Sequence, residues 1–478
     1  MRILKKVLKW TGIIIGGLVI IALITHIVLN IVWGRELQNK LAELKAKGEP
    51  TTIAEIRPAP VPDNENAAVL YNKVFVLMIS GEGGRPYISK KKVGKFNKTI
   101  AIIQDVKSYA DIFEWTEKQR QEIPKLVNSS DMQHIYALLE QASKRPECNF
   151  NLKYEDGSEA FLPHLSKMRT LARLLSVKAL IEAQSGDLDK AFDTIFVGLK
   201  MSNHLKNEPF LISQLVRIAC DMIIVDCIEQ TSNKYNISQE KARNLIIELE
   251  KHLGSEPFKK SMDGERVLLG RRVEFNKFLN RGHSMKILEA FFRSGYGFLP
   301  ELYYLEGTWL FNPLIKKDLA CYMTLLSEIK GSCDIPYSES IAEENNIESK
   351  FKTDTPEYCI VTRMFVPALF RNKEKMSVYE TQIQICRTGL ALKIYKTKYG
   401  AYPESLATLT PDILEKIPSD PFTDKNLIYK KSKEGFELYS LGPNMKDDGG
   451  IPRFRGKAKT DAEIMSNINY DIVWKCEK

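Results

Sequence analysis

The most prominent feature of the hydrophobic pattern is an uncharged run near the N-terminus, WTGIIIGGLVIIALITHIVLNIVW, from Trp10 to Trp33. A helix of this length spans about 36 Å, which exceeds the hydrocarbon core of a bilayer, about 30 Å thick. Tryptophans stand at both ends of the run, where amphipathic rings favour the headgroup region, and basic residues precede it. We therefore predict a cytoplasmic tip and transmembrane anchor over residues 1–34. The protein would be single-pass in the inner (cytoplasmic) membrane, with a cytoplasmic N-terminus and a periplasmic or otherwise extracytoplasmic body.

A cleaved signal peptide is the alternative interpretation of this segment. The apolar region of a signal peptide usually covers about 7–15 residues and ends in a small-x-small cleavage site. The run here is longer and continues into LNIVWGREL, which favours the anchor. His26 is its one ionisable side chain, and we expect a bystander there, with a functional intramembrane histidine as the alternative.

The pattern after the anchor predicts a stalk and linker at 35–62 and then a helical domain at 63–255. Apolar positions in this domain recur with helical spacing, and two helices of the segment 165–205 meet at a turn around Gly186. The GDLDKA turn makes this hairpin similar to a tetratricopeptide unit. No second copy occurs in register, so a helix-hairpin domain of unassigned kind is the other interpretation.

Residues 256–372 form a middle region that we predict to be helical and rich in aromatic side chains. Its densest aromatic stretch, at 291–314, indicates core or a domain interface, with a membrane-facing or ligand-stacking role as the alternative. The segment 331–358 is polar and acidic, and it predicts a loop.

Charge and cysteine content exclude several classes of protein. The formal net charge of +9 is small for 478 residues, and the basic patch at 89–98 has no stacking platform beside it, so we expect no nucleic-acid partner. The eight cysteines show no C-x-x-C spacing, which argues against a zinc ribbon or a thioredoxin motif. Disulfides are permissible outside the cytoplasm, but the sequence does not indicate which cysteines would pair.

The C-terminal residues 373–478 carry the pattern of a helix followed by short strands. An amphipathic helix at 378–400 ends at Gly400, and the alternating segments NLIYKK and FELYS flank SKEG, where we expect Gly435 to adopt positive φ. YDIVWK offers a third strand. The predicted fold is therefore mainly α with a small C-terminal α+β module. It comprises the anchor, the hairpin array, and a helix packed on a three-stranded antiparallel sheet.

This module resembles the globular part of the major pseudopilin of type II secretion. The resemblance rests on ALKIYKTKYGAYPESLATL, on IPSDPFTDKNLIYKKSKEGFELYSLGPNMKDDGG and on the final DIVW, and it covers 378–474. The anchor has no glutamate between Lys9 and Arg35, so we expect neither prepilin processing nor assembly into a pilus. With its segments PVPDNENAA, LPHL and EPFLISQLVRIA, the whole chain is similar to large membrane-anchored bacterial proteins of uncharacterised function.

In the pseudopilin family the loop after the second strand binds Ca²⁺. The resemblance implies a structural calcium site formed by the carbonyl of Leu441, the side chains of Asn444, Asp447 or Asp448, and the carboxylate of Asp471. Hard oxygen ligands from a flexible loop suit this cation. The alternative is a plain turn, because Asn, Asp and Gly satisfy backbone groups locally.

No motif of an enzyme stands out. The six histidines show no paired-ligand spacing, and His164 is expected to cap a helix or to lie in a polar interface. We therefore predict a membrane-tethered structural or interaction protein that contacts other envelope proteins, without an identified small-molecule substrate. The alternative is an envelope hydrolase or carbohydrate-active enzyme whose site is built from residues distant in sequence.

Overall fold

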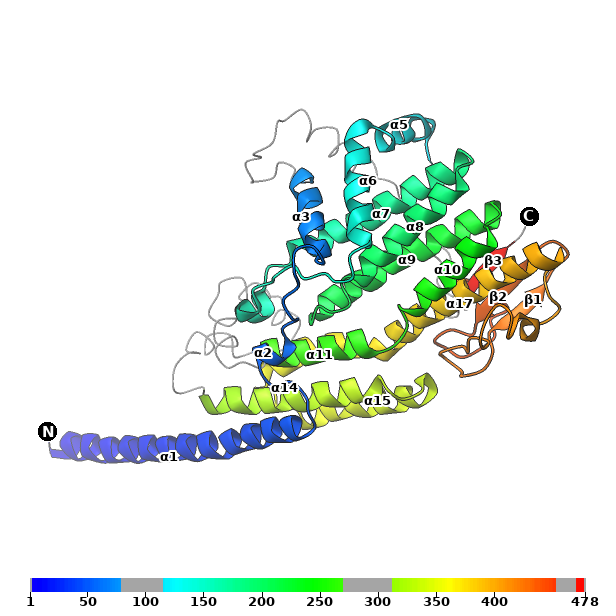
Figure 1. Cartoon of the computed structure of the whole chain (residues 1–478). Coiled ribbons are helices and arrows are strands. Elements are labelled where there is room, and N and C mark those ends of the chain that lie inside the picture. Colours follow the sequence, from blue (N-terminus) through cyan, green and yellow to red (C-terminus); the bar gives the residue numbers. More distant parts are fainter. Residues whose placement is uncertain (1, 79–114, 270–311, 453–469, 477–478) are drawn as a thin grey trace.

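The computed structural model describes residues 2–78, 115–269, 312–452 and 470–476, which are mainly helical with one small sheet near the C-terminus (Figure 1). The α-helices are α1 (Arg2–Ala46), α2 (Ile53–Ile56), α3 (Ala67–Leu77), α5 (Glu117–Val127), α6 (Ser130–Ser143), α7 (Pro163–Gln184), α8 (Leu188–Asn203), α9 (Leu211–Lys234), α10 (Gln239–Glu250), α11 (Glu256–Leu269), α14 (Asn312–Ser332), α15 (Tyr337–Asp354), α16 (Ile360–Phe365) and α17 (Asn372–Tyr399). Short 3₁₀ helices are η2 (Tyr154–Glu159), η5 (Val366–Leu369) and η6 (Leu406–Leu409), and the strands are β1 (Ile428–Lys431), β2 (Phe436–Ser440) and β3 (Ile472–Cys476). The basic patch at 89–98 and the aromatic residues at 291–311 lie outside the described residues.

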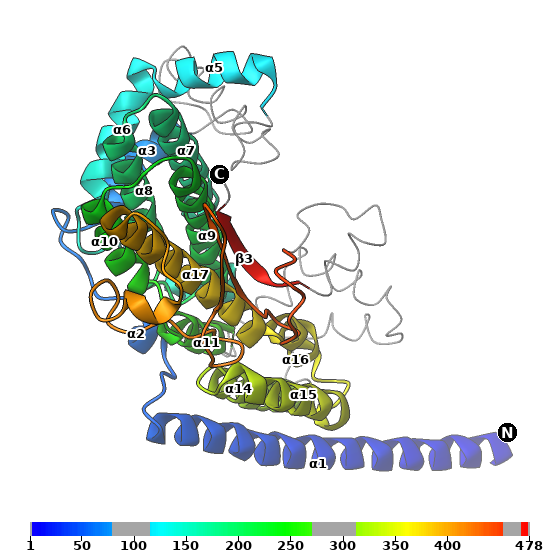
Figure 2. The ribbon, with the colours of Figure 1, turned by 90° about the vertical axis from the view of Figure 1, so that its right-hand side faces the viewer.

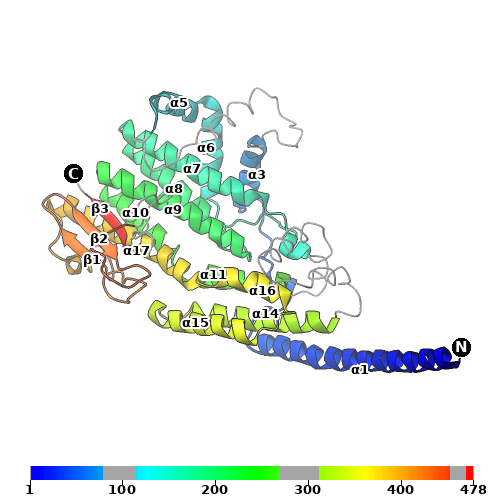
Figure 3. The same cartoon turned by 180° about the vertical axis from the view of Figure 1, so that it is seen from behind.

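The helices are stacked in layers above α1. Next to α1 lie α14 and α15, followed by α11 and α17, then α8 to α10, with α5 and α6 on the far side (Figure 1 and Figure 2). The sheet lies at the end of the body that is distant from the N-terminus (Figure 3).

Helix α1 continues without interruption from the apolar run into the predicted stalk. It is the one helix, among those that the structure describes, with the length and composition to cross a membrane, as an anchor or a signal sequence. Its apolar side chains from Val7 to Val32 are mostly exposed, whereas Leu37 and Leu44 are buried in a core shared with α14. The predicted stalk therefore packs against the body, and it ends where Gly48 adopts positive φ.

The predicted helix hairpin at 165–205 is present as α7 and α8. Gly186 joins them with φ of 88°, a conformation that glycine adopts without steric cost. Both helices contact α9, and a single buried core extends from α3 through this array to α17 and the sheet. The C-terminal module consequently shares its core with the helical array.

The segment 331–358 was expected to be a loop, and this prediction is wrong, because residues 337–354 form α15. Tyr337, Ile347 and Phe351 are buried, and the last two belong to the core beneath α14. With the partly buried Ile341 they make four large apolar residues in a strongly polar segment, which gave too weak a periodic signal although they suffice to hold the helix against its neighbours.

The C-terminal strands form an antiparallel sheet in the order β1-β2-β3, and α17 packs on β2 and β3. Helix and sheet approach closely at Gly389, where a Cβ atom would lie 2.2 Å from the Trp474 ring. Gly400 ends α17 with φ of 81°, as predicted. The expectation of positive φ at Gly435 is wrong, and that position instead lies against the carbonyl of Cys476, where a Cβ atom would clash.

Candidate metal site and buried polar networks

Asp420, a buried carboxylate, accepts hydrogen bonds from residues at the start of the loop after β2. Its Oδ1 accepts hydrogen bonds from the Ser440 hydroxyl at 2.8 Å and from the Phe422 amide at 2.9 Å, and its Oδ2 accepts one from the Leu441 amide at 3.3 Å. Sequence reasoning missed this residue as part of the site, although the Asp–Pro step in SDPF belongs to the resemblance. Because Leu441 is held by its amide, its position at the start of the loop is fixed.

Two of the predicted ligands use their side chains to close turns. The Asn444 Oδ1 accepts a hydrogen bond from the Lys446 amide at 3.0 Å, and the Asp447 Oδ1 accepts one from the Gly449 amide at 2.9 Å. The Tyr439 hydroxyl also donates to the Asp447 Oδ1, at 3.1 Å. These contacts are those expected of a plain turn.

The other two predicted ligands with side-chain oxygens are the carboxylates Asp448 and Asp471. The Asp448 Oδ2 accepts a hydrogen bond from the Asn444 amide group at 2.8 Å, and the Asp471 Oδ2 accepts one from the Gly450 amide at 2.7 Å. Asp471 is 1% exposed, and its Oδ1 is buried without a hydrogen-bond partner. A buried acceptor without a donor is costly, so this oxygen is the one feature of the loop that the turn does not explain.

Asp447 and Asp448 bring negative charge close to Asp471. Burial raises the pKa of this carboxyl above its usual value, and the charges of Asp448 and Asp447 add to the rise. The amides of Gly450 and Asp448 oppose it. A bound cation would reverse the effect, because it favours the ionised carboxylate.

The predicted ligands offer the oxygen donors that calcium prefers, and their positions meet only part of the geometry of a calcium site. All five predicted ligands lie in the loop or directly beside it, and each offers a hard oxygen. In the part of the chain that the structure describes, however, no group of three or more His, Cys, Asp or Glu side chains is arranged to hold a metal ion. Binding would therefore require Asp447 or Asp448 to turn toward the unpartnered oxygen of Asp471.

A second polar cluster is buried between α8, α9, α17 and the residues just after α10. Asp221 contacts the Ser202 hydroxyl and lies 3.0 Å from the Nδ1 of His252, while the Tyr379 hydroxyl donates to it at 2.7 Å. Arg217 lies 3.6 Å from the same carboxylate. Burial opposes ionisation of Asp221, yet His252 and Arg217 hold its pKa below the usual value.

This cluster does not have the arrangement of a nucleophile triad. In a triad the histidine lies between the hydroxyl and the carboxylate, whereas here Asp221 lies between Ser202 and His252. All three side chains are also shielded from solvent. The cluster therefore acts as a polar link between helices.

His164 lies in a third buried cluster, which confirms the prediction of a polar interface for this residue. Its Nε2 lies 2.9 Å from the Oε1 of Glu208, and the Ser213 hydroxyl donates to the same carboxylate at 2.5 Å. The Phe150 ring stacks on the imidazole with centroids 4.2 Å apart.

A cavity of about 610 Å³ lies between α1, α11 and α14. Arg35 and Gln38 of α1, Arg266 of α11, and Lys316 and Met323 of α14 are among the residues that line it. Its described lining contains no histidine, cysteine or carboxylate side chain. The described lining of this cavity therefore does not supply the acid and base groups that the hydrolase alternative needs.

Comparisons with known proteins returned no match, whether against models of protein families, curated proteins or solved structures. The pseudopilin resemblance of 378–474 accordingly stays a prediction that rests on the residues of this chain.

Proposed function

We propose that this chain is a membrane-tethered, extracytoplasmic structural or interaction protein that holds its C-terminal module away from the membrane for contact with other envelope proteins. The observation that carries the proposal is the continuity of α1, whose first part is apolar and exposed and whose last part is packed into the body. The pseudopilin resemblance of the module favours a type II secretion-like or related envelope assembly as its partner.

The packing of α1 favours a retained anchor over a cleaved signal. Lys316 of α14 donates to the side-chain oxygen of Asn30 at 2.8 Å, and Lys317 pairs with Glu36 at 2.6 Å. The body therefore contacts α1 directly where the apolar run ends. Cleavage behind the run would cut a continuous helix whose following residues, Leu37 and Leu44, belong to a core.

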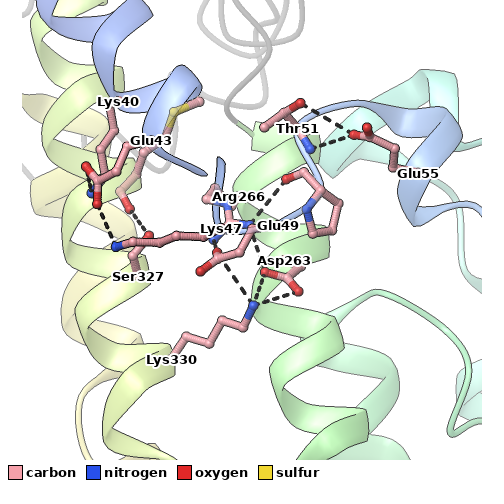
Figure 4. A network of polar contacts seen from close by, with 12 residues as sticks. Lys40, Glu43, Lys47, Glu49, Thr51, Glu55, Asp263, Arg266, Ser327 and Lys330 are labelled. Carbon is pink, nitrogen blue, oxygen red and sulfur yellow. Dashed lines mark hydrogen bonds and ion pairs between the residues drawn. The ribbon is translucent and has the colours of Figure 1, made fainter. Parts of the chain in front are cut away.

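The end of α1 is joined to the body by a network of charged side chains (Figure 4). Arg266 of α11 is 2% exposed on its side chain, and it contacts Glu49 just after α1 and Asp263 on its own helix. Lys330 of α14 lies 2.7 Å from Asp263 and 3.5 Å from Glu49. The network links three segments distant in sequence, so the anchor and the body are connected over a broad contact.

The charges beside the apolar run indicate how the chain is oriented across the membrane. Basic residues before the apolar run place the N-terminus in the cytoplasm by the positive-inside rule. The sheet lies at the opposite end of the body from the N-terminus (Figure 1 and Figure 3). In this arrangement the C-terminal loop faces the extracytoplasmic space, where millimolar calcium suits a weak site.

Reporter fusions at Lys478 test the orientation. We expect a phosphatase that folds only outside the cytoplasm to be active there, and green fluorescent protein to be dark. As a matched control, the same reporters are fused to a variant that lacks 10–33, and their activities should be reversed. A fluorescent, phosphatase-inactive fusion of the full chain would contradict the proposed placement.

For the loop at 441–450 we propose a calcium ion held by Asp471 and Asp448, with Asp447, Asn444 and the carbonyl of Leu441 as further ligands. The support is the buried, unpartnered oxygen of Asp471 and the excess of negative charge beside it. The ion would be structural, since it would join the loop to the start of β3.

Calcium should raise the melting temperature of the detergent-solubilised full chain. A site with a Kd of about 1 mM gives about 1.4 kcal/mol at about 10 mM calcium, which for a chain of this length is a shift of about 1–2 °C. We expect Asp471→Asn to abolish the shift, whereas Asp412→Asn, an exposed carboxylate of the same module, should retain it. No shift in the wild-type chain would leave the plain turn as the explanation.

A further inference from the structure

Two cysteines that are far apart in sequence lie side by side. Cys321 is in the middle of α14, and Cys359 is the residue immediately before α16. Their sulfur atoms are 3.9 Å apart, with the Cys359 thiol donating to the Cys321 sulfur. A disulfide bond needs about 2.05 Å, so the two sulfur atoms would have to approach each other by about 1.9 Å.

The approach of these thiols is fixed by the contacts around them. Asp318, one turn before Cys321, accepts hydrogen bonds from the amides of Val361 and Thr362 at 2.9 and 3.0 Å. The first turn of α16 is thereby attached to α14 at the height of the cysteines. Beside them, the Tyr358 ring lies 5.7 Å from the Trp33 ring of α1, at the end of the apolar run.

Access and chemistry distinguish this pair from the other cysteines. Cys321 is partly exposed, whereas the remaining seven are buried. The hydrogen bond from Cys359 holds the pKa of Cys321 below its usual value against the effect of burial, and the Lys317 ammonium acts in the same direction. The same hydrogen bond, together with burial, raises the pKa of Cys359. Cys321 is therefore the thiol that a disulfide-bearing oxidant meets first.

We propose that Cys321 and Cys359 form a disulfide bond in an oxidising compartment and thereby join α14 to α16 beside the anchor. This inference rests on the proposed extracytoplasmic placement, because thiols stay reduced in the cytosol. The other thiols in the described part of the chain are buried and lack such a partner at this distance.

The reaction is a two-step exchange with a small or protein disulfide as the oxidant. The Cys321 thiolate attacks one sulfur of that disulfide, which forms a mixed disulfide and releases one thiol after proton uptake. Cys359 then loses its proton and attacks the Cys321 sulfur, which releases the second thiol. Two protein thiols are oxidised, and one disulfide is reduced to two thiols.

The bond would close a loop between residues that are 38 positions apart, and this loop includes α15. Cross-links of this kind stabilise chiefly by restricting the unfolded chain. Oxidised protein should consequently melt about 4 °C above the same protein reduced with dithiothreitol.

Peptide mapping of the full chain tests the pair directly. Reduced, detergent-solubilised protein is incubated with oxidised glutathione, alkylated under denaturing conditions and digested with trypsin. We expect a linked species of peptides 318–330 and 353–363, which contain Cys321 and Cys359 and exclude Cys333. Both cysteines fully alkylated, or Cys321 carrying glutathione alone, would overturn the proposal.

Two further arms complete the test. Cys321→Ser should leave Cys359 alkylated, while Cys333→Ser, a buried thiol near the end of α14, should leave the linked species unchanged. The redox state is also trapped in intact cells by acid quenching. A pair that forms with glutathione yet stays reduced in cells supports the geometry and contradicts the extracytoplasmic placement, so the two failures are distinguishable.

Discussion

Replacing Asp221 by alanine is expected to destabilise the protein by about 3–5 kcal/mol, because it leaves Arg217 and His252 buried without their carboxylate. The same change removes the acceptor of the Tyr379 hydroxyl, which connects α17 to the helical array. Breaking one partner of a buried ion pair costs far more than the net contribution of the intact pair. The measurement is the shift in urea or thermal unfolding of the detergent-solubilised chain.

The control for this prediction is a pair on the surface. Asp193 contacts Lys241, and its side chain is 65% exposed, so Asp193→Ala is expected to change stability little. A comparable loss of stability in the two variants would show that the burial of Asp221 does not increase its contribution to stability. Since Asp221 of α9 links α8, α17 and His252 just after α10, we also expect its variant to loosen the contact between α17 and α9.

The second large effect is a pH dependence at Asp318. Burial raises the pKa of this carboxyl to about 6, although the hydrogen bonds from Thr362 and Val361 oppose the rise. In the unfolded chain the pKa is about 3.9. The protonated form is thus favoured by folding, so this stabilising contribution is complete below about pH 4 and is lost as the pH rises through about 6.

The size of this effect follows from the difference between the two pKa values. Between about pH 4 and pH 7 the wild-type chain should lose about 2 kcal/mol relative to Asp318→Asn, which does not titrate. The variant also loses an acceptor for the Val361 amide, and that cost is the same at every pH. The comparison of melting temperatures across the pH range therefore isolates the titration. Parallel curves for the two proteins would contradict the prediction.

The candidate metal site shows which parts of a site can be predicted from local sequence. Four of the predicted ligands lie within eight residues of the chain, so any loop there brings them near one another: Leu441, Asn444, Asp447 and Asp448. The pairing of β2 with β3 then places Asp471 beside the loop. Sequence left open whether Asn444 and Asp447 would close turns or serve as ligands, because that choice depends on side-chain orientation, and the structure shows both of them closing turns.

The sequence by itself determined the apolar span of α1, the helix hairpin of α7 and α8, and the order of helix and strands in the C-terminal module. These features depend on residues within a few positions of one another, so periodicity and turn residues reveal them. The length and lack of charge between Trp10 and Trp33 likewise need no partner to be recognised.

The tertiary structure alone decided which distant residues meet. It packed the stalk of α1 on α14, held residues 337–354 as a helix, and brought Cys321 to Cys359. The burial of Asp221 and the raised pKa of Asp318 have the same origin. Burial and charge pairing depend on the approach of segments that are far apart in the chain, and no local pattern encodes that approach.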